Sequence, residues 1–213
     1  MRPVPLPSDG AGAALDDWLT AERALNGTAE ATITAYRRDV AGFLGFLTLY
    51  RSETLGTGAL AEIGQTDMRA WMAAERQRGL GARSLARALS AVKSFFQWLG
   101  EREGFEPTAV LATRSPKYQR KLPRPLAEDA ARAMIDTVEL QARDGWVAAR
   151  DTAVVTLLYG CGLRISEALG LTCRDAPLPE TLKILGKGGK ERIVPVLPAA
   201  REAVDAYLRL SPH

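Results

Sequence analysis

The sequence contains only one histidine and two cysteines, and these shortages limit the chemistry open to it. The histidine, His213, is the last residue, so we expect neither a histidine-based metal site nor a catalytic triad that depends on histidine. Cys161 and Cys173 are too few to form a disulfide framework, which favours a reducing environment. The sequence therefore predicts a cytoplasmic protein without a histidine-based metal centre.

Long apolar runs are lacking as well. No stretch approaches the ~18 residues that are needed to cross a bilayer. The first residues, MRPVPLP, do not contain the apolar core of a signal peptide. The rest of the composition, 46% hydrophobic and 25% charged over 213 residues, is typical of one large or two small globular domains. We therefore expect neither membrane insertion nor export.

Positive charge is concentrated in the middle of the chain. The net charge is only +3, but residues 69–126 hold twelve Lys and Arg against four Asp and Glu, a local excess of eight. The flanking segments, 1–68 and 127–213, have net charges of −4 and −1. A local excess of this size is a candidate footprint for a polyanion, although a solvated basic surface would give the same pattern.

The spacing of apolar residues predicts four helices in the first hundred residues, at 11–25, 28–50, 68–77 and 83–100. We expect Thr28 and the pair Thr66–Asp67 to cap the second and third of these helices, and residues 52–58 to form a loop. The stretch 114–126 contains three prolines and five basic residues and no acid, which predicts an extended interdomain linker.

The second half predicts a mixture of helices and one hairpin. Helices are expected at 127–141, 147–159, 163–170 and 198–210, and strands at 181–185 and 191–196 around the turn-rich sequence GKGGK. The fold class is thus mainly α with a small β-hairpin. The expected divisions are a tail (1–10), a four-helix domain (11–110), a basic linker (111–125) and a second domain (126–213).

The helix at 83–99 has a face suited to DNA. Its apolar stripe consists of Leu85, Leu89, Val92, Phe96 and Leu99, and its other face carries arginine, serine and glutamine and no acid. Such side chains donate to phosphates and base edges, and small serines allow close approach. An ordinary amphipathic surface helix is the alternative. The candidate nucleic-acid contacts are Arg38, Arg83, Ser84, Arg87, Ser90, Lys93, Ser94, Lys117, Arg120, Lys121 and Arg124.

Arg164 follows the turn Gly160-Cys161-Gly162 and is expected in the first turn of a helix. A cation beside free N–H groups at a helix start suits a bound phosphate, and Glu167, three residues on, could hold the guanidinium in position. The alternative is a surface ion pair between Arg164 and Glu167.

Lys187 lies in the loop GKGGKER, where glycines would let it reach into a groove and act as a general acid. The loop is not a nucleotide-binding P-loop, because a strand follows it and not Ser or Thr at the start of a helix. The alternative is a solvent-exposed turn.

Together these motifs resemble the tyrosine recombinases of the bacterial Xer type. The resemblance covers residues 11 to 213, and the stretches that carry it are TITAYRRDV (32–40), SLARALS (84–90), LPRPL (122–126), YGCGLRISE (159–167) and GKGGKER (186–192). The length around residues 52–58 favours the C-type paralogue over the D-type.

The resemblance implies an N-terminal SAM-like core-binding domain and the first part of an α+β catalytic domain. In this family a tyrosine attacks the scissile phosphate of duplex DNA, giving a 3′-phosphotyrosyl link and a free 5′-hydroxyl. Arg164 would bind the non-bridging oxygens, Glu167 would support the site, and Lys187 would protonate the 5′-oxygen. No metal or energy cofactor is implied. The implied partners are a duplex recombination site and a second recombinase of the family in a tetrameric synapse.

The family's downstream His-x-x-Arg, its following His or Trp and its nucleophilic tyrosine have no counterpart in the sequence, so we expect a truncated chain that does not cleave DNA alone. None of the five tyrosines has the position of the nucleophile. Two alternatives stay open: a DNA-binding protein without the chemistry, and a phage or mobile-element integrase. The second is disfavoured because only about ten residues precede the first expected helix, whereas such integrases usually carry an extra arm-binding domain.

Overall fold

The computed structural model describes residues 9–52, 56–119, 144–186 and 189–212, together with 127, 129–130, 133–135 and 137. The chain divides into two compact units, Met1–Lys121 and Leu122–His213. In the described part, no helix is both long and apolar enough to cross a membrane.

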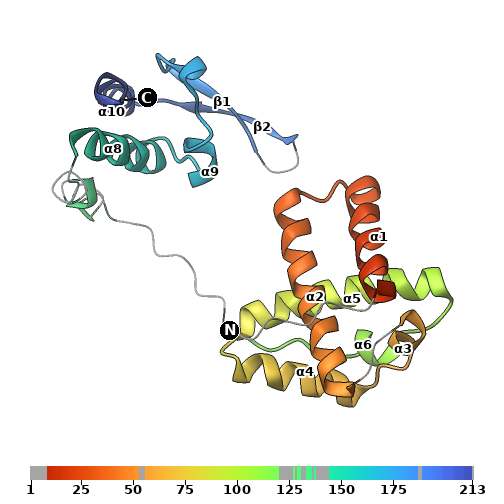
Figure 1. Cartoon of the computed structure of the whole chain (residues 1–213). Helices are drawn as coiled ribbons and strands as arrows, with labels where there is room; N and C mark the ends of the chain where they lie inside the picture. The colour runs from red at the N-terminus through yellow and green to blue at the C-terminus, as the bar shows by residue number, and fades with distance from the viewer. Residues whose placement is uncertain are drawn as a thin grey trace. The chain divides into compact units, whose positions relative to one another are not determined.

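The first unit is all helical. Its elements in chain order are α1 (Asp9–Asn26), α2 (Glu30–Arg51), α3 (Thr57–Ala61), α4 (Gln65–Gln77), α5 (Ala82–Glu103) and α6 (Thr108–Leu111). The helices α1 and α2 form one pair, and α4 and α5 form a second pair that crosses it (Figure 1). The four long helices match the sequence prediction, while α6 and most of α3 were not predicted. The predicted loop 52–58 therefore ends earlier than expected, because α3 begins at Thr57.

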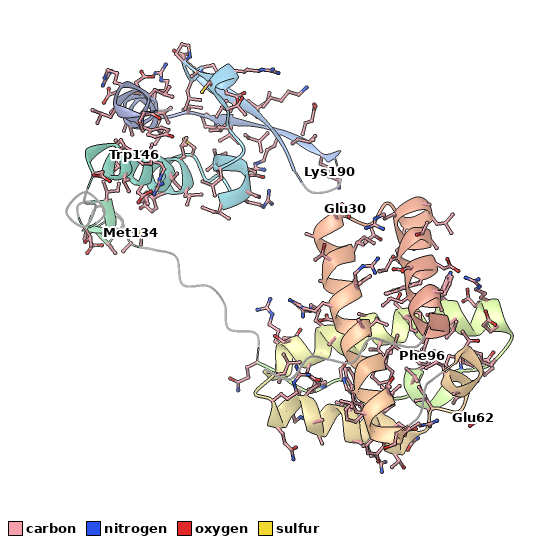
Figure 2. All side chains as sticks on the ribbon, viewed as in Figure 1. Glu30, Glu62, Phe96, Met134, Trp146 and Lys190 are labelled. Atoms are coloured by element: carbon pink, nitrogen blue, oxygen red, sulfur yellow. The ribbon has the colours of Figure 1, made fainter. Side chains whose placement is uncertain are left out.

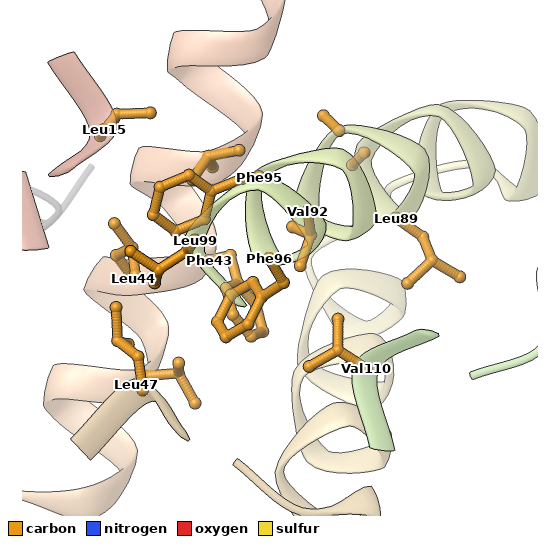
Figure 3. Packing of buried hydrophobic residues seen from close by; sticks show 14 of the residues in the cluster. Leu15, Phe43, Leu44, Leu47, Leu89, Val92, Phe95, Phe96, Leu99 and Val110 are labelled. Atoms are coloured by element: carbon orange, nitrogen blue, oxygen red, sulfur yellow. The ribbon is translucent and has the colours of Figure 1, made fainter. Parts of the chain in front are cut away.

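Apolar periodicity explains why these segments fold together. All five residues of the predicted stripe on α5 are fully buried: Leu85, Leu89, Val92, Phe96 and Leu99. Phe96 lies edge-on to Phe43 with ring centroids 5.8 Å apart, and Phe43 lies edge-on to Trp71 at 5.0 Å. Figure 3 shows Phe96 and Phe43 in contact at the centre of this core. The aromatic cluster thus joins α2, α4 and α5.

The predicted cap at Thr28 is wrong, and of the predicted pair Thr66–Asp67 only Asp67 caps its helix, from a position inside it. The N-cap of α2 is Ala29, and no side chain there accepts a hydrogen bond from the first turn of the helix. The Thr28 hydroxyl donates instead to the Glu22 carboxylate at 2.9 Å. The helix α4 begins after Gly64, whose backbone N–H donates to the Asp67 carboxylate at 2.8 Å. In both places a capping side chain was expected one or two residues away from where the backbone turns into the helix.

A close approach fixes the turn that follows α5. The helix ends at Gly104, which has the left-handed φ of 77°. A Cβ atom on Gly100 would lie 2.5 Å from the carbonyl oxygen of Phe105 and 2.9 Å from Cδ of Pro107, so a side chain there would push the turn away. The chain then passes through α6 and runs back beside α4 and α5 (Figure 1).

The second unit packs two helices against a hairpin. Its described elements are α8 (Gly145–Gly160), α9 (Ile165–Ala168), a 3₁₀ turn (Cys173–Asp175), β1 (Thr181–Leu185), β2 (Glu191–Pro195) and α10 (Pro198–Leu210). The strands pair antiparallel, with Thr181 opposite Pro195 and Leu185 opposite Glu191. Leu182, Ile184 and Val194 point to the same face and are buried. The predicted class, mainly α with a small hairpin, is confirmed.

The remaining predictions for this unit differ at their edges. The helix expected at 163–170 is reduced to the four residues of α9, and the helix expected at 127–141 lies mostly outside the described residues. A pocket of about 260 Å³ opens between α8 and α10, and its lining includes Leu157, Val204 and Tyr207. Leu208 of α10 lines this pocket as well.

Candidate functional site

A glycine turn positions Arg164. The helix α8 ends at Gly160, and Gly162 adopts a φ of 63°, a left-handed conformation that favours glycine. Leu163 is buried, so it anchors the chain directly before Arg164. Arg164 is the N-cap of α9 and lies outside the helix, which corrects the expectation that it lies in the first helical turn.

Glu167 is held from three sides. Its Oε2 accepts a hydrogen bond from the backbone N–H of Arg164 at 2.8 Å, and its Oε1 accepts one from Nη1 of Arg164 at 2.8 Å. Arg192, on β2, donates from Nη1 to Oε1 at 2.8 Å and from Nη2 to Oε2 at 2.7 Å. Glu167 does contact the Arg164 guanidinium, as the spacing of three residues predicted, but Arg192 provides the two-pronged contact.

These contacts keep Glu167 ionised. The bond from the Arg192 side chain, followed by the bond from the Arg164 backbone, lowers the pKa of Glu167 far below its usual range. The same pairing raises the pKa of Arg192. The carboxylate is therefore negative at neutral pH, and it holds two guanidinium groups side by side.

Arg164 retains most of its donors. Its side chain is 65% exposed, whereas that of Glu167 is 9% exposed. A guanidinium has five N–H donors in a rigid fork, and within the described residues only the bond from Nη1 is used. The remaining donors can bind two oxygens of a phosphate while Glu167 fixes the orientation of the group.

Sequence reasoning missed Arg192. It stands 25 residues after Glu167, and only the fold of the hairpin brings the two together. Arg192 is the last residue of the motif GKGGKER, which was singled out from the sequence for its lysine. No rule of sequence spacing connects an arginine on a strand to a carboxylate 25 residues earlier. Its exposed fraction of 35% shows that the contact lies at the edge of the unit.

The hairpin loop begins beside the two arginines. A Cβ atom on Gly186 would lie 3.8 Å from Nη1 of Arg192 and 4.0 Å from Nη1 of Arg164. Lys187 directly follows Gly186 but lies outside the described residues. Lys190, at the other end of the loop, is exposed (Figure 2).

The second group of candidate residues lies on the first unit, where α5 borders a groove of about 530 Å³. We call this the α5 groove, and its lining residues are Arg83, Ser84, Ala86, Arg87, Ser90, Ser115 and Tyr118. Four of the predicted nucleic-acid contacts, Arg83, Ser84, Arg87 and Ser90, thus line one concave surface. Arg83 is exposed, and no carboxylate contacts it within the described residues.

The α5 face is less free of acid than the sequence indicated. Asp39 reaches it from α2 and accepts two hydrogen bonds of 3.0 Å from Nε and Nη2 of Arg87. Arg38 approaches the same carboxylate at 3.4 Å. The helix itself carries no acid on this face, but tertiary packing supplies one, so part of the charge of Arg87 is neutralised.

The remaining candidates are placed as follows. Lys93 donates to the carbonyl oxygen of Leu111 at 2.6 Å and so helps to hold α6, and Ser94 is half-buried. Lys117 is exposed in the segment after α6. Arg120, Lys121 and Arg124 lie outside the described residues. Among the side chains that the structure places, no three His, Cys, Asp or Glu residues form a group that could hold a metal ion.

Comparison with known proteins gives matches in both units. A family model described as "Phage integrase, N-terminal SAM-like domain" matches residues 15–103, and the model "Phage integrase family" matches residues 124–211. The tyrosine recombinase XerC of Rhodospirillum centenum is 44% identical over 196 residues, covering 92% of the chain and 57% of the relative. That of Brucella suis is 39% identical over 211 residues, covering 98% of the chain and 67% of the relative.

Solved structures show the same fold at low identity. A lambda integrase tetramer bound to a Holliday junction matches with a TM-score of 0.62 and 20% identity, covering 91% of the chain and 55% of the integrase chain. The Tn1549 transposon integrase in complex with circular intermediate DNA matches with a TM-score of 0.61 and 15% identity, covering 93% and 65%. The chain spans between about half and two thirds of the length of these proteins.

Proposed function

Because the chain belongs to the tyrosine recombinases of the phage integrase family, we propose that it supplies the DNA-binding domain and the first part of the catalytic domain of a site-specific DNA recombinase. The reaction is a transesterification. A tyrosine hydroxyl attacks the scissile phosphate, its proton leaves, a phosphotyrosyl bond forms at the 3′ side, and the bond to the 5′-oxygen breaks. The 5′-oxygen takes up a proton and is later the nucleophile that reverses the step.

The observation that carries the proposal is the arrangement of Arg164, Glu167 and Arg192. Glu167 holds Arg164 by its backbone and by one nitrogen, and the rest of the guanidinium faces solvent. A preorganised, exposed guanidinium is suited to the non-bridging oxygens of a phosphate, where negative charge increases in the transition state. Arg164 is the residue we assign to this role, and Glu167 orients it.

Lys187 is the residue we assign to protonation of the leaving 5′-oxygen. Its neighbour Gly186 lies close to the Arg164 guanidinium, because a Cβ atom added to Gly186 would be 4.0 Å from Nη1 of Arg164. A lysine one residue further along the loop can reach a phosphate bound at Arg164. A general acid at this point is needed because an alkoxide is a poor leaving group.

The first unit would bind the duplex. The α5 groove combines arginine and serine donors with a concave shape, and it lies within the segment of the chain that has an excess of eight positive charges. We place the protein with the Xer type of recombinase that resolves chromosome dimers, in the cytoplasm. The matched relatives are named XerC, and the lambda integrase structure is a tetramer on DNA, which supports assembly with a second recombinase in a tetrameric synapse.

We also propose that none of the five tyrosines in these 213 residues is the nucleophile. Tyr36 stacks on Trp18 and Tyr50 stacks on Phe46, both in the first unit. Within the described residues, no hydrogen bond joins a tyrosine to Arg164 or Glu167. The chain alone should therefore give no covalent adduct with a nicked suicide substrate on a denaturing gel. An adduct that disappears when one of these tyrosines is replaced by phenylalanine would contradict this assignment.

A chimera tests the catalytic roles. Residues 1–213 are joined to the remaining C-terminal segment of the Brucella suis relative, and covalent adduct formation is measured. Arg164→Lys should slow the reaction by roughly 10²–10³-fold, the cost of losing one preorganised donor, with little change in DNA affinity. Lys187→Ala should also slow it, but a substrate with a bridging 5′-sulfur, which needs no proton, should rescue only this variant. Equal rescue of both variants, or of neither, would contradict the division of roles.

A further inference from the structure

A second basic groove lies on the first unit, along α4. It has a volume of about 570 Å³, and we call it the α4 groove; its lining residues are Gln65, Arg69, Met72, Arg76, Ala112, Thr113 and Arg114. The four residues from α4 are spaced by four, three and four positions, so they form one face of that helix. Three arginines thus converge on one concave surface, and none of them was among the nucleic-acid contacts indicated by the sequence motifs.

The arginines of this groove differ from the others in the first unit. Seven described arginines of the unit contact a carboxylate: Arg23, Arg37, Arg38, Arg51, Arg78, Arg87 and Arg102. Four described arginines of this unit do not: Arg69, Arg76, Arg83 and Arg114. Arg69 makes one long contact of 3.4 Å with the amide oxygen of Gln65. The positive charges along this groove are therefore not neutralised by a carboxylate of the described residues, whereas those of the seven paired arginines are.

The α4 groove and the α5 groove are bordered by the same segment of chain. Ala112, Thr113 and Arg114 line the first, and Ser115 and Tyr118 of the same extended segment line the second. This segment runs back beside both helices (Figure 1), and side chains that end in nitrogen project from α4 and from the start of α5 (Figure 2). The α4 groove and the α5 groove thus lie on either side of one extended segment of chain.

We propose that the α4 groove binds the phosphate backbone of the same DNA duplex that the α5 groove contacts. Arg69 and Arg76 are separated by two helical turns, about 10.5 Å along the axis at 1.5 Å per residue. The two guanidinium groups lie on the same face of α4 and can therefore contact separate phosphates of one strand. Arginine side chains at such a surface fix the position of the duplex without reading its sequence.

The role of this groove rests on the proposed function, since it requires that the chain binds duplex DNA. The test is a measurement of duplex DNA affinity by the full 213-residue chain at several salt concentrations. Each neutralised phosphate contributes about −0.9 to the slope of log K against log salt. A variant with Arg69→Gln, Arg76→Gln and Arg114→Gln should therefore lose about 2.7 from the magnitude of this slope, and it should lose affinity equally for all duplex sequences.

A second triple variant controls for net charge. Arg23→Gln, Arg37→Gln and Arg102→Gln remove the same three charges from arginines that are paired with Glu30, Asp16 and Asp17. This variant should keep a slope close to that of the wild type. If the groove variant loses its helical circular dichroism signal, the three single variants carry the test, and each should lower the slope by about 0.9.

The outcomes separate the two proposals. A groove variant whose slope and affinity match those of the paired-arginine control would overturn the role of the α4 groove. A loss of affinity confined to one duplex sequence would also overturn it, because it would indicate base readout and not backbone contact. A wild-type chain without salt-dependent binding to duplex DNA would instead contradict the proposed function.

Discussion

Arg192 donates to both carboxylate oxygens of Glu167, at 2.7 and 2.8 Å, across 25 residues of sequence. The pair links the hairpin to the N-terminus of α9, and Arg164 donates to one oxygen of the same carboxylate. Because Arg192 occupies both oxygens, the orientation of Glu167 does not depend on what Arg164 binds. Arg164 can therefore exchange solvent for phosphate while the carboxylate stays in place.

The first prediction concerns the response of this cluster to acid. The pKa of Glu167 is lower in the folded protein than in the unfolded chain, where it is about 4.3. Its contribution to stability is fully present above that value and is lost as the pH falls below it towards the folded pKa. The free energy of unfolding of the second unit, measured with urea, should thus fall as the pH is lowered below about 4.3. This fall should be smaller in Glu167→Gln, which lacks the titrating carboxyl group.

A carboxyl ¹³C NMR titration gives the direct measurement. In the wild type, the Glu167 signal should not titrate with the other glutamates, and Arg192→Gln should move its pKa upward towards the ordinary value, because the largest cause of the lowering is removed. Glu30, on the other unit, serves as the internal control and should titrate unchanged in the variant. An unchanged Glu167 signal in Arg192→Gln would mean that Arg164 alone accounts for the shift.

The second prediction concerns Asp39 and Arg87. The Asp39 side chain is 7% exposed and that of Arg87 is 48% exposed. Arg87→Ala leaves a poorly solvated carboxylate without its two hydrogen bonds, and it should lower the free energy of unfolding by about 1 kcal/mol, at the low end for an unsatisfied group because half of the arginine faces water. Asp39→Asn should cost less and should release Arg87. Thermal unfolding should show a larger loss of stability in Arg87→Ala than in Asp39→Asn. DNA affinity should be retained only in Asp39→Asn, because this variant keeps the arginine.

The third prediction concerns DNA binding by the chain as a whole. If about six phosphates are contacted, the slope of log K against log salt should be near −5. The double variant Arg83→Ala, Arg87→Ala should weaken binding well beyond Arg23→Ala, since Arg23 is paired with Glu30 and lies on neither groove. Affinity that is flat from low to moderate salt would contradict electrostatic binding, and equal losses in the two variants would remove the α5 groove from the interface.

The fourth prediction concerns the aromatic core of the first unit. Phe96 is fully buried and contacts Phe43 and Phe95. Phe96→Ala should lower the free energy of unfolding by about 3–5 kcal/mol, through lost burial and the cavity that remains. Leu25→Ala is the matched control, because Leu25 is 82% exposed and its removal should change little. Chemical denaturation followed by tryptophan fluorescence distinguishes the two, as Trp71 packs against the same cluster.

Sequence reasoning predicted what depends on local periodicity. The stripe on α5 and the two paired strands were predicted because an apolar repeat and a glycine-rich turn are properties of adjacent residues. Contacts across the fold were not. Asp39 meets Arg87 over 48 residues and Glu167 meets Arg192 over 25, and no spacing rule encodes either distance.

Helix ends were predicted less well for a different reason. The N-cap is the residue at which the backbone enters the helix. Its position differs from the predicted one by one residue at Thr28 and by two residues at Thr66. The same uncertainty placed Arg164 inside a helix, whereas it caps one. For the site this difference matters, because a cap residue has its side chain clear of the helix and free to meet a ligand.

The close contact at Gly100 has a consequence for how the basic surfaces can change. The carbonyl of Phe105 approaches to 2.5 Å of where a methyl group would stand, so even alanine would displace the turn that leads into α6 and the segment after it. That segment separates the two basic grooves and lines both. A neutral substitution in the interior could therefore alter DNA affinity as much as the loss of an arginine, by shifting the spacing between phosphate contacts without removing any of them.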